Sequence, residues 1–243
     1  MISDPITHAM VLAAGLGTRM RPITNTIPKP LVKVKGRALL DRNIDQLHAR
    51  GVRNIVVNGH HLMQKMEAHL AELGDKDVVL SREPDLLDQG GGIRQALPDL
   101  GDGDFFILNG DAFWKDDVGQ SALASLEAQW DAEQMDFLLL VAPMTRSTGF
   151  DGPGDFFLET GGQLMFRGEA DHAPFVYTGA GIFSRRIFSE QTERVFPLVP
   201  LFREARQKGR LFGTQLSGHW FHIGTPAAID LAEQEMTRLG LMD

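Results

Sequence analysis

Short apolar runs recur through the first two thirds of the chain. The run over residues 8–12 is bounded on both sides, which is typical of a buried strand. Similar runs are found at 54–58, 78–81, 104–108 and 137–142. We therefore predict strands at all five places.

Segments with apolar residues at helical spacing separate these runs. Helices are predicted over 39–50, where Gly51 ends the pattern, over 61–73, where Gly74 ends it, and over 121–130. Strands and helices that alternate in this order favour a mainly parallel sheet with helices on both faces. The sequence therefore predicts an α/β fold, a three-layer αβα arrangement around a mainly parallel, twisted sheet.

The pattern is less regular after Pro143. Residues 149–163 are rich in glycine and carry Asp151 and Asp155. We expect a small irregular subregion here, without repeats or a linker. The predicted strands are 156–158, 164–167, 175–183, 210–216 and 219–223, and the predicted helices are 185–194, 197–207 and 226–239.

Composition narrows the possible classes of function. The 243 residues carry a formal net charge of −8, which argues against a general nucleic-acid binder, and 43% of them are apolar. The absence of cysteine excludes a disulfide framework, a thiolate zinc site and a cysteine nucleophile. No apolar run approaches the roughly 18 residues of a membrane helix, and the first five residues do not resemble a signal peptide. We expect a cytoplasmic protein that binds neither nucleic acid nor membrane.

A loop of small residues follows the first predicted strand. Ala13, Ala14, Gly15 and Gly17 leave room for a ligand to approach the backbone N–H groups. Arg19 adds a planar guanidinium, which suits phosphate oxygens. Residues 13–21, called the glycine loop below, are therefore predicted to bind phosphate.

A lysine between two prolines strengthens this prediction. Pro28 and Pro30 restrict the backbone around Lys29, so the lysine loses less entropy when it binds an anion. The loop is not a P-loop, because no Gly-Lys-Ser/Thr follows it, and Met20 replaces the third glycine of a dinucleotide-binding motif. Taken without the Pro-Lys-Pro segment, the loop is equally compatible with a strand end that carries a solvated Arg19.

The stretch from Leu12 to Arg21, with Pro28-Lys29-Pro30, resembles the signature of sugar-1-phosphate nucleotidyltransferases, and the resemblance extends over about residues 8–239. It implies an enzyme with a Rossmann-like fold that joins a nucleoside triphosphate to a sugar 1-phosphate and releases pyrophosphate. It also implies one domain over residues 1–243. Within this domain, the nucleotide-binding part is expected over about residues 7–143, and the sugar-binding part with the closing helix over about residues 144–243.

The resemblance and the chemistry together suggest roles for the glycine loop and its surroundings. Arg19 is expected to hold the β- and γ-phosphates that leave. Lys29 is expected to hold the α-phosphate together with the attacking phosphate. The expected nucleotide-binding residues are Leu12, Ala13, Ala14, Gly15, Gly17, Thr18, Gln89, Gly91 and Gly92.

A second polar group, Asn109-Gly110-Asp111, ends the strand predicted at 104–108. Ligands in open α/β sheets bind outside the carboxyl ends of the strands. One hard carboxylate beside a triphosphate suits Mg²⁺, so Asp111 is the expected metal ligand, and Asn109 is expected to bind a sugar hydroxyl. The alternative is an Asx turn that merely closes the strand.

The third group is His219-Trp-Phe-His-Ile-Gly-Thr-Pro226, where the family usually has Trp-x-Asp-x-Gly-Thr with the aspartate as second metal ligand. This chain has His222 at that place, and imidazole suits Mn²⁺ better than Mg²⁺. Three interpretations stay open: His222 binds a softer ion, acts through a water on the ion, or has lost the role to Asp151 or Asp155. A histidine that is simply hydrogen-bonded near a helix start is the fourth.

Residues 83–93 resemble the Leu-x-Thr-Gly-Gly-Gly-Ile stretch of bacterial uridylyltransferases that act on N-acetylmuramate 1-phosphate. We expect a loop before a helix, in which the glycines let a base and ribose lie against the backbone and Gln89 contacts a base edge. A helix-entry turn that needs glycine is the alternative.

Residues 177–182 resemble the family's sugar-binding strand, which makes Thr178 and the Gly179 backbone candidate sugar contacts. Glu169 lies where many members have a sugar-binding glutamate, although the local match is poor. An ordinary β-branched strand residue is the alternative for Thr178.

The resemblance favours UTP and N-acetylmuramate 1-phosphate as substrates, with Mg²⁺ or Mn²⁺ as cofactor, in a monomer or small homo-oligomer. Guanylyl transfer to mannose or heptose 1-phosphate, thymidylyl transfer to glucose 1-phosphate and transfer to phosphocholine stay open. A non-catalytic nucleotide-sugar-binding regulatory protein is the alternative of another class. A nicotinamide oxidoreductase is disfavoured by Met20 and by the cationic loop.

Overall fold

The computed structural model describes residues 5–241. Residues 242–243 lie outside the described part, as do residues 1–4, which enter the argument against a signal peptide. Within residues 5–241, no helix is both long and apolar enough to cross a membrane.

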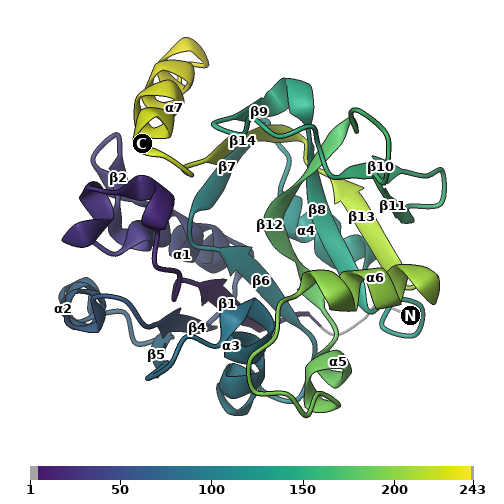
Figure 1. Cartoon of the computed structure of the whole chain (residues 1–243), viewed down its shortest axis with the longest axis horizontal. Helices are drawn as coiled ribbons and strands as arrows, with labels where there is room; N and C mark the ends of the chain where they lie inside the picture. Colours follow the sequence, from purple (N-terminus) through teal and green to yellow (C-terminus); the bar gives the residue numbers. More distant parts are fainter. Residues whose placement is uncertain (1–4, 242–243) are drawn as a thin grey trace.

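One part of the central sheet is parallel, as the alternation of strands and helices predicts. Strands β5, β4, β1 and β6 lie side by side in that order and run in the same direction (Figure 1). Their bounds are Val78–Arg82 for β5, Asn54–Gly59 for β4, His8–Leu12 for β1 and Phe105–Asn109 for β6. Their carboxyl ends therefore meet at one edge of the sheet.

The sheet continues through strands of mixed direction. β12 (Phe175–Phe183) pairs antiparallel with both β6 and β8 (Phe137–Pro143), and β13 (Leu211–Gln215) runs parallel to β8. β10 (Phe156–Leu158) and β11 (Leu164–Phe166) form a hairpin that extends the sheet beyond the start of β12. The glycine-rich segment therefore forms the irregular subregion that its sequence predicts.

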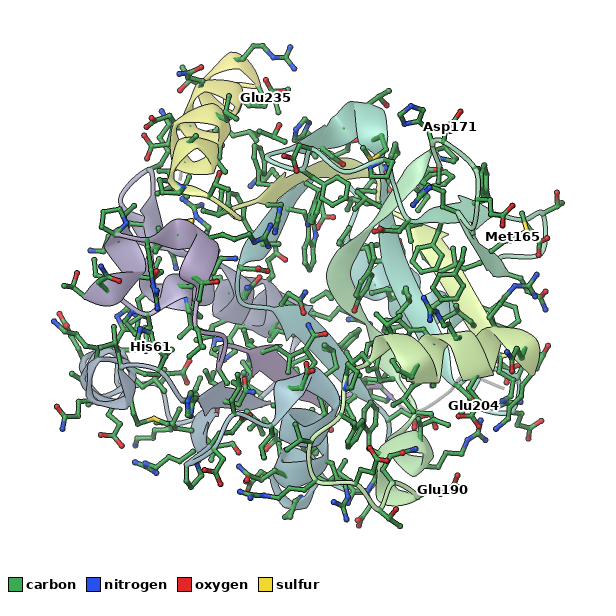
Figure 2. All side chains as sticks on the ribbon, viewed as in Figure 1. His61, Met165, Asp171, Glu190, Glu204 and Glu235 are labelled. Atoms are coloured by element: carbon green, nitrogen blue, oxygen red, sulfur yellow. The ribbon has the colours of Figure 1, made fainter. Side chains whose placement is uncertain are left out.

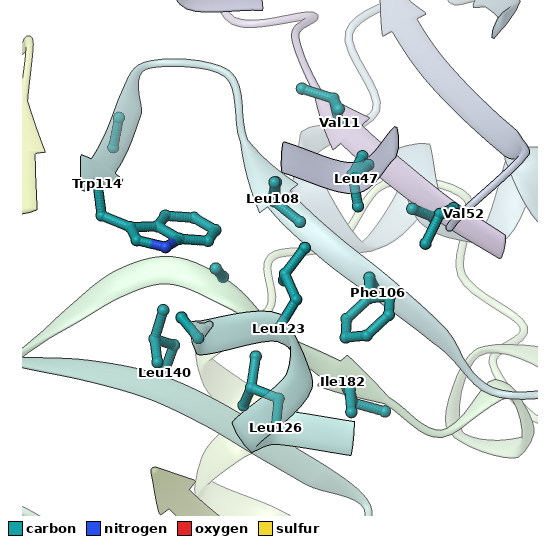
Figure 3. Packing of buried hydrophobic residues seen from close by; sticks show 14 of the residues in the cluster. Val11, Leu47, Val52, Phe106, Leu108, Trp114, Leu123, Leu126, Leu140 and Ile182 are labelled. Atoms are coloured by element: carbon teal, nitrogen blue, oxygen red, sulfur yellow. The ribbon is translucent and has the colours of Figure 1, made fainter. Parts of the chain in front are cut away.

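Helices cover both faces of the sheet. One face carries α1 (Leu39–Arg50), α2 (Met63–Leu73) and α4 (Ala122–Gln129), and the other carries α3 (Asp88–Ala96), α5 (Arg185–Ser189) and α6 (Val199–Gln207). Alternation along β1 produces the two cores, because Val11 belongs to the first and Met10 to the second. Figure 3 shows Val11 in the first core with Leu47 of α1 and Leu123 of α4. The three-layer αβα architecture is confirmed.

A smaller sheet joins the two halves of the chain. It consists of β7 (Ala112–Asp116), β14 (Gly218–His222) and β9 (Ser147–Thr148), and α7 (Pro226–Arg238) packs against it through a core that includes Phe113 and Phe221. Sequence reasoning missed β7, which begins directly after Asp111. A further hairpin, β2 (Lys33–Val34) with β3 (Arg37–Ala38), precedes α1.

Two predicted elements differ clearly from the structure. The helix predicted over 185–194 is α5, which ends at Ser189, and residues 194–196 lie against α3 instead. The glycines at 90–92 are not in a loop before a helix, because α3 begins at Asp88 and contains them. The other predicted helices and strands differ from the structure only by small shifts of their ends.

Candidate functional site

The glycine loop folds back on itself directly after β1. Gly17 has a φ of 60°, and a Cβ atom there would lie 2.9 Å from Cγ2 of Thr24. The Thr24 hydroxyl donates a hydrogen bond to the Gly17 carbonyl at 2.7 Å. The shape of the loop itself therefore requires glycine at position 17.

The backbone N–H groups of this loop differ in their accessibility to a ligand. The Ala13 N–H donates to Oδ1 of Asn58 at 2.6 Å, so the expectation that this group points at a phosphate is wrong. Gly15 is exposed, and no atom lies within 4 Å of the place where its Cβ would be. The backbone at Gly15 is therefore open to a ligand, whereas the backbone at Ala13 is anchored inside the protein.

A cavity of about 430 Å³, the first cavity, lies at the carboxyl ends of β1, β4 and β6. It brings together the predicted residues Leu12, Ala13, Ala14, Gly15, Lys29, Gln89, Asn109 and Asp111. Glu83 and Val195 also line it, and sequence reasoning assigned no role to either. The signal for Glu83 was its place directly after β5, at the edge where the parallel strands end.

A second cavity of about 650 Å³ shares Asn109 and Asp111 with the first. It is lined by Arg19, Asp151, Asp155, Thr178 and His222 among the residues singled out from the sequence. Arg19 is exposed at this cavity and does not line the first one. Asp111 therefore stands where two binding spaces meet.

Lys29 and Asp111 form an ion pair at this junction. Nζ of Lys29 lies 2.7 Å from Oδ2 of Asp111, and the Lys29 side chain is almost completely buried. Burial raises the pKa of Asp111, but the hydrogen bond from His222 and the positive charge of Lys29 outweigh it and hold the pKa well below its ordinary value. Asp111 is therefore a carboxylate throughout the neutral and mildly acidic range.

His222 faces Asp111 from the neighbouring strand. Its Nδ1 lies 3.3 Å from the Gly149 carbonyl, and its Nε2 lies 3.7 Å from Oδ2 of Asp111. A carbonyl oxygen only accepts, so the contact with Gly149 places a proton on Nδ1 and turns Nε2 towards Asp111. The ring also stacks on Trp220, with centroids 5.6 Å apart and planes 9° apart.

This donor set fits a divalent metal ion. It offers one carboxylate oxygen and one imidazole nitrogen on the same side of the junction, and these two groups would hold a divalent ion that takes its other ligands from water and substrate. Asp155 offers less, because its Oδ2 accepts the Tyr177 N–H at 2.9 Å. The geometry therefore favours His222 over Asp155 as the partner of Asp111.

A second group of potential metal ligands, His48, Asp75 and Asp77, lies elsewhere. His48 is in the last turn of α1, and Asp77 directly precedes β5, so the group is at the amino ends of the strands, opposite the cavities. Arg53 lies 3.8 Å from Asp77. Sequence reasoning did not identify this group.

Asn109 and Gly179 are in direct contact. Gly179 has a φ of 85° at a register shift in β12, and a Cβ there would lie 2.6 Å from Cβ of Asn109. Glycine at 179 therefore lets β12 approach β6. Oδ1 of Asn109 is buried and has no hydrogen-bond partner within the described residues, which leaves an acceptor for a ligand between the two cavities.

The Thr178 hydroxyl is turned into the sheet. It donates to the Leu140 carbonyl at 2.9 Å and accepts the Ala180 N–H at 3.2 Å. Thr178 lines the second cavity, but its hydroxyl has no donor left for a sugar. Its predicted contact with a sugar stays a prediction, and such a contact would not use the hydroxyl proton.

The three glycines of α3 serve packing. A Cβ at Gly90 would lie 2.3 Å from the Phe196 ring, one at Gly91 2.3 Å from the Arg194 carbonyl, and one at Gly92 2.5 Å from Oε1 of Glu83. These glycines lie inside α3 and do not line the first cavity, so their predicted contact with the base finds no support in their position. Gln89, one residue earlier, does line the first cavity.

Glu169 is not brought to either cavity. It lies in an exposed turn after β11, between Met165 and Asp171, which Figure 2 shows at the periphery of the molecule. Its predicted sugar contact finds no support in this position, because the turn extends outward from the irregular subregion. Thr18 is likewise exposed and lines neither cavity.

The chain is similar to known proteins over nearly its whole length. A family model described as nucleotidyl transferase matches residues 8–150. The chain is 41% identical over 233 residues to N-acetylmuramate alpha-1-phosphate uridylyltransferase of Caulobacter vibrioides, covering 94% of this chain and 96% of the relative. It is 30% identical over 229 residues to the protein of the same name from Neisseria meningitidis serogroup B, covering 93% and 96%.

Solved structures show the same fold. HddC from Yersinia pseudotuberculosis, complexed with GMP-PN, superposes with a TM-score of 0.75 at 20% identity, covering 95% of this chain and 99% of that one. UTP-bound UGPase from Acinetobacter baumannii superposes with a TM-score of 0.73 at 19% identity, covering 98% and 99%. With the family match and the identities above, the chain belongs to the nucleotidyl transferase family, among the sugar-1-phosphate nucleotidyltransferases.

Proposed function

We propose that this enzyme transfers a uridylyl group from UTP to N-acetylmuramate 1-phosphate and releases pyrophosphate. The observation that carries the proposal is the pair of cavities that meet at Asn109 and Asp111, which gives each substrate its own space and brings two phosphates together. The identity of the base and of the sugar rests on the 41% identity to the Caulobacter vibrioides relative.

The two cavities support a division of the chain. Apart from Val195, all the residues that line the first cavity precede residue 143, which fits a nucleotide-binding part over about 7–143. Most of the second cavity is built from residues after 144, including Gly149, Tyr177 and Trp220, which fits a sugar-binding part over about 144–243. The small sheet that joins the parts sets the position of His222 against Asp111.

The proposed reaction needs no protein nucleophile. An oxygen of the sugar phosphate attacks the α-phosphorus, the new P–O bond forms, and the bond from the α-phosphorus to the bridging oxygen of the β-phosphate breaks. The attacking phosphate is already mostly a dianion at neutral pH, because the second pKa of a phosphate ester is about 6. The work of the protein is therefore positioning and charge stabilisation.

Two cations have separate roles in this mechanism. Lys29 lies at the junction and exchanges its contact with Asp111 for the α-phosphate and the attacking phosphate. Arg19 is exposed at the second cavity and closes on the β- and γ-phosphates that leave. Both roles follow from the charge that accumulates around the α-phosphorus in the transition state.

The family generally uses a divalent metal ion. Asp111 and His222 would hold it here, and a bound ion neutralises charge on the α-phosphate. Because one of the two ligands is an imidazole, Mn²⁺ is expected to support activity at least as well as Mg²⁺.

A substrate panel tests the proposal. Pyrophosphate release is measured with UTP, GTP, dTTP and CTP against N-acetylmuramate, mannose, heptose and glucose 1-phosphates, with Mg²⁺ and with Mn²⁺. The highest kcat/KM is expected for UTP with N-acetylmuramate 1-phosphate. Preference for GTP with mannose or heptose 1-phosphate contradicts the assignment of the substrates. Nucleotide binding without turnover on any pair contradicts the catalytic function and favours a regulatory protein.

A further inference from the structure

A chain of three hydrogen bonds joins three residues that line the first cavity, Ala13, Asn58 and Glu83, to Leu87. The Ala13 N–H donates to Oδ1 of Asn58 at 2.6 Å, Nδ2 of Asn58 donates to Oε1 of Glu83 at 2.6 Å, and the Leu87 N–H donates to Oε2 of Glu83 at 3.2 Å. These residues lie at the end of β1, in β4, just after β5 and just before α3. The chain of bonds therefore links the glycine loop to the start of α3 across the cavity.

The two side chains of this network are almost completely buried. Asn58 is 3% exposed and Glu83 is 2% exposed, and both line the first cavity. Burial raises the pKa of the Glu83 carboxyl, and the hydrogen bonds from Asn58 and Leu87 act against this rise. Each carboxylate oxygen receives an N–H donor, so the contacts fit the ionised form. The pair also requires Gly92, where a Cβ would lie 2.5 Å from Oε1 of Glu83 and 2.9 Å from Nδ2 of Asn58.

A purely structural explanation accounts poorly for this arrangement. Burying a carboxylate is unfavourable, and apolar side chains of similar volume generally hold neighbouring strands together at lower cost. Hydrogen bonds are directional, whereas apolar contacts are not. The network fixes the orientation of the Ala13 peptide and of the first turn of α3, and both walls of the cavity depend on these two orientations.

We infer that Asn58 and Glu83 are a positioning pair for nucleotide binding, which sets the separation and orientation of the glycine loop and the start of α3. This inference rests on the proposed function, because it takes the first cavity as the nucleotide site. The pair acts through Ala13 and Leu87, and no direct contact of Glu83 with the base is required.

The polarity of the network gives a sharp test. In Glu83→Gln, an amide NH₂ faces either Asn58 Nδ2 or the Leu87 N–H, so one donor meets another. In Asn58→Asp, a carboxylate oxygen faces Oε1 of Glu83. The double variant Asn58→Asp with Glu83→Gln reverses the central bond, because the new amide at position 83 then donates to the new carboxylate at position 58. All three hydrogen bonds and the net charge are retained.

We expect each single variant to raise the Kd and KM for UTP by about ten-fold or more, as the loss of a buried hydrogen bond does. The double variant should return both values to within about three-fold of the wild type. The Kd for UTP is measured by calorimetry without the sugar phosphate. The KM is measured by steady-state kinetics at a temperature well below the melting temperature of each variant. Asn54→Asp and Glu72→Gln, at exposed positions outside both cavities, control for the change of charge.

The outcomes separate the possible roles. Single variants that melt earlier but bind UTP normally show a structural role and overturn the inference. A double variant that stays as impaired as the single variants, or that changes its preference among UTP, GTP and dTTP, also overturns it and favours direct contact with the base. If the wild type turns over no substrate pair, the proposed function fails, and the nucleotide Kd values still decide whether the pair positions the cavity.

Discussion

The first half of the chain, residues 7–143, and the second half, residues 144–243, contribute to the site in different ways. The first half places Asn58, Asn109 and Asp111 at the ends of parallel strands, where their positions follow from the order of the elements. The second half places His222 through a small sheet and approaches Asn109 through a bulge at Gly179. The first half therefore contributes residues at the ends of parallel strands, and the second half contributes His222 and the Gly179 backbone through the small sheet and the bulge.

This contrast extends to the charges around the α-phosphate. The cations Lys29 and Arg19 and the carboxylate of Asp111 all come from the first half. The second half contributes the imidazole of His222, where the family usually has an aspartate. If Asp111 and His222 hold the ion as proposed, one negative metal ligand instead of two holds it less strongly through charge. More of the stabilisation of the phosphates is then expected from Lys29 and Arg19.

The largest effect is expected for Lys29→Ala. Loss of the only buried cation described at the junction should lower kcat by about 10²–10³-fold, because its contact with the transferring phosphate strengthens in the transition state. Steady-state pyrophosphate release with the preferred substrate pair measures this. Lys65→Ala, at an exposed position in α2, is the matched control and should turn over normally. Near-normal turnover of Lys29→Ala would remove the basis of the mechanism.

The next test compares the two halves directly. Arg19→Ala is expected to lower kcat/KM by about 10²-fold. His222→Ala should lower it by about ten-fold, because Asp111 and the phosphates still hold the ion. Both are measured at saturating Mn²⁺. Equal losses in the two variants would contradict the idea that the cations of the first half carry the larger share.

A third change restores the usual chemistry of the family at one position. In His222→Asp, the ratio of activity with Mg²⁺ to activity with Mn²⁺ is expected to rise by about ten-fold, because a second carboxylate suits the harder ion. Metal titrations at fixed substrate measure the ratio. His172→Asp, at an exposed position that lines neither cavity, controls for the exchange of an imidazole for a carboxylate. An unchanged ratio would show that His222 does not contact the ion.

The fold and the positions of the glycine loop and of Asp111 could be predicted from the sequence, because they depend on local patterns. The apolar run 8–12, the loop after it and the polar residues at 109–111 gave β1, the glycine loop and Asp111 in their correct places. The bond between Asn58 and Glu83 was found only in the structure, because it depends on which strand ends are neighbours. The hydrogen bond from the Thr178 hydroxyl to Leu140 was found only in the structure for the same reason, since Leu140 is on another strand.

The glycines of α3 show a further limit of prediction from the sequence. They lie in the first half of the chain and pack against residues of the second half. Their small size suggested an open surface, but the segment 194–196 of the second half fills the space. Gly90→Ala should destabilise the protein by about 1–3 kcal/mol, because its Cβ would overlap the Phe196 ring. Thermal unfolding measures the loss, and Gly103→Ala, where no atom lies within 4 Å of the Cβ position, is the control. Equal melting temperatures for the two variants would contradict this packing role.

The smallest effect concerns the surface of the first half, where Nε2 of His69 in α2 lies 2.6 Å from Oδ1 of Asp41 in α1. The hydrogen bond with Asp41 raises the pKa of His69 above its ordinary value of 6.5, despite partial burial, which lowers it. The stabilisation is therefore fully present below pH 6.5 and is lost as the pH rises through the folded-state pKa. The melting temperature of the wild type should exceed that of His69→Gln at about pH 5.5, and the difference should shrink by about pH 8.5. A difference that stays constant with pH would show that packing alone, and not the charge of His69, links these two helices.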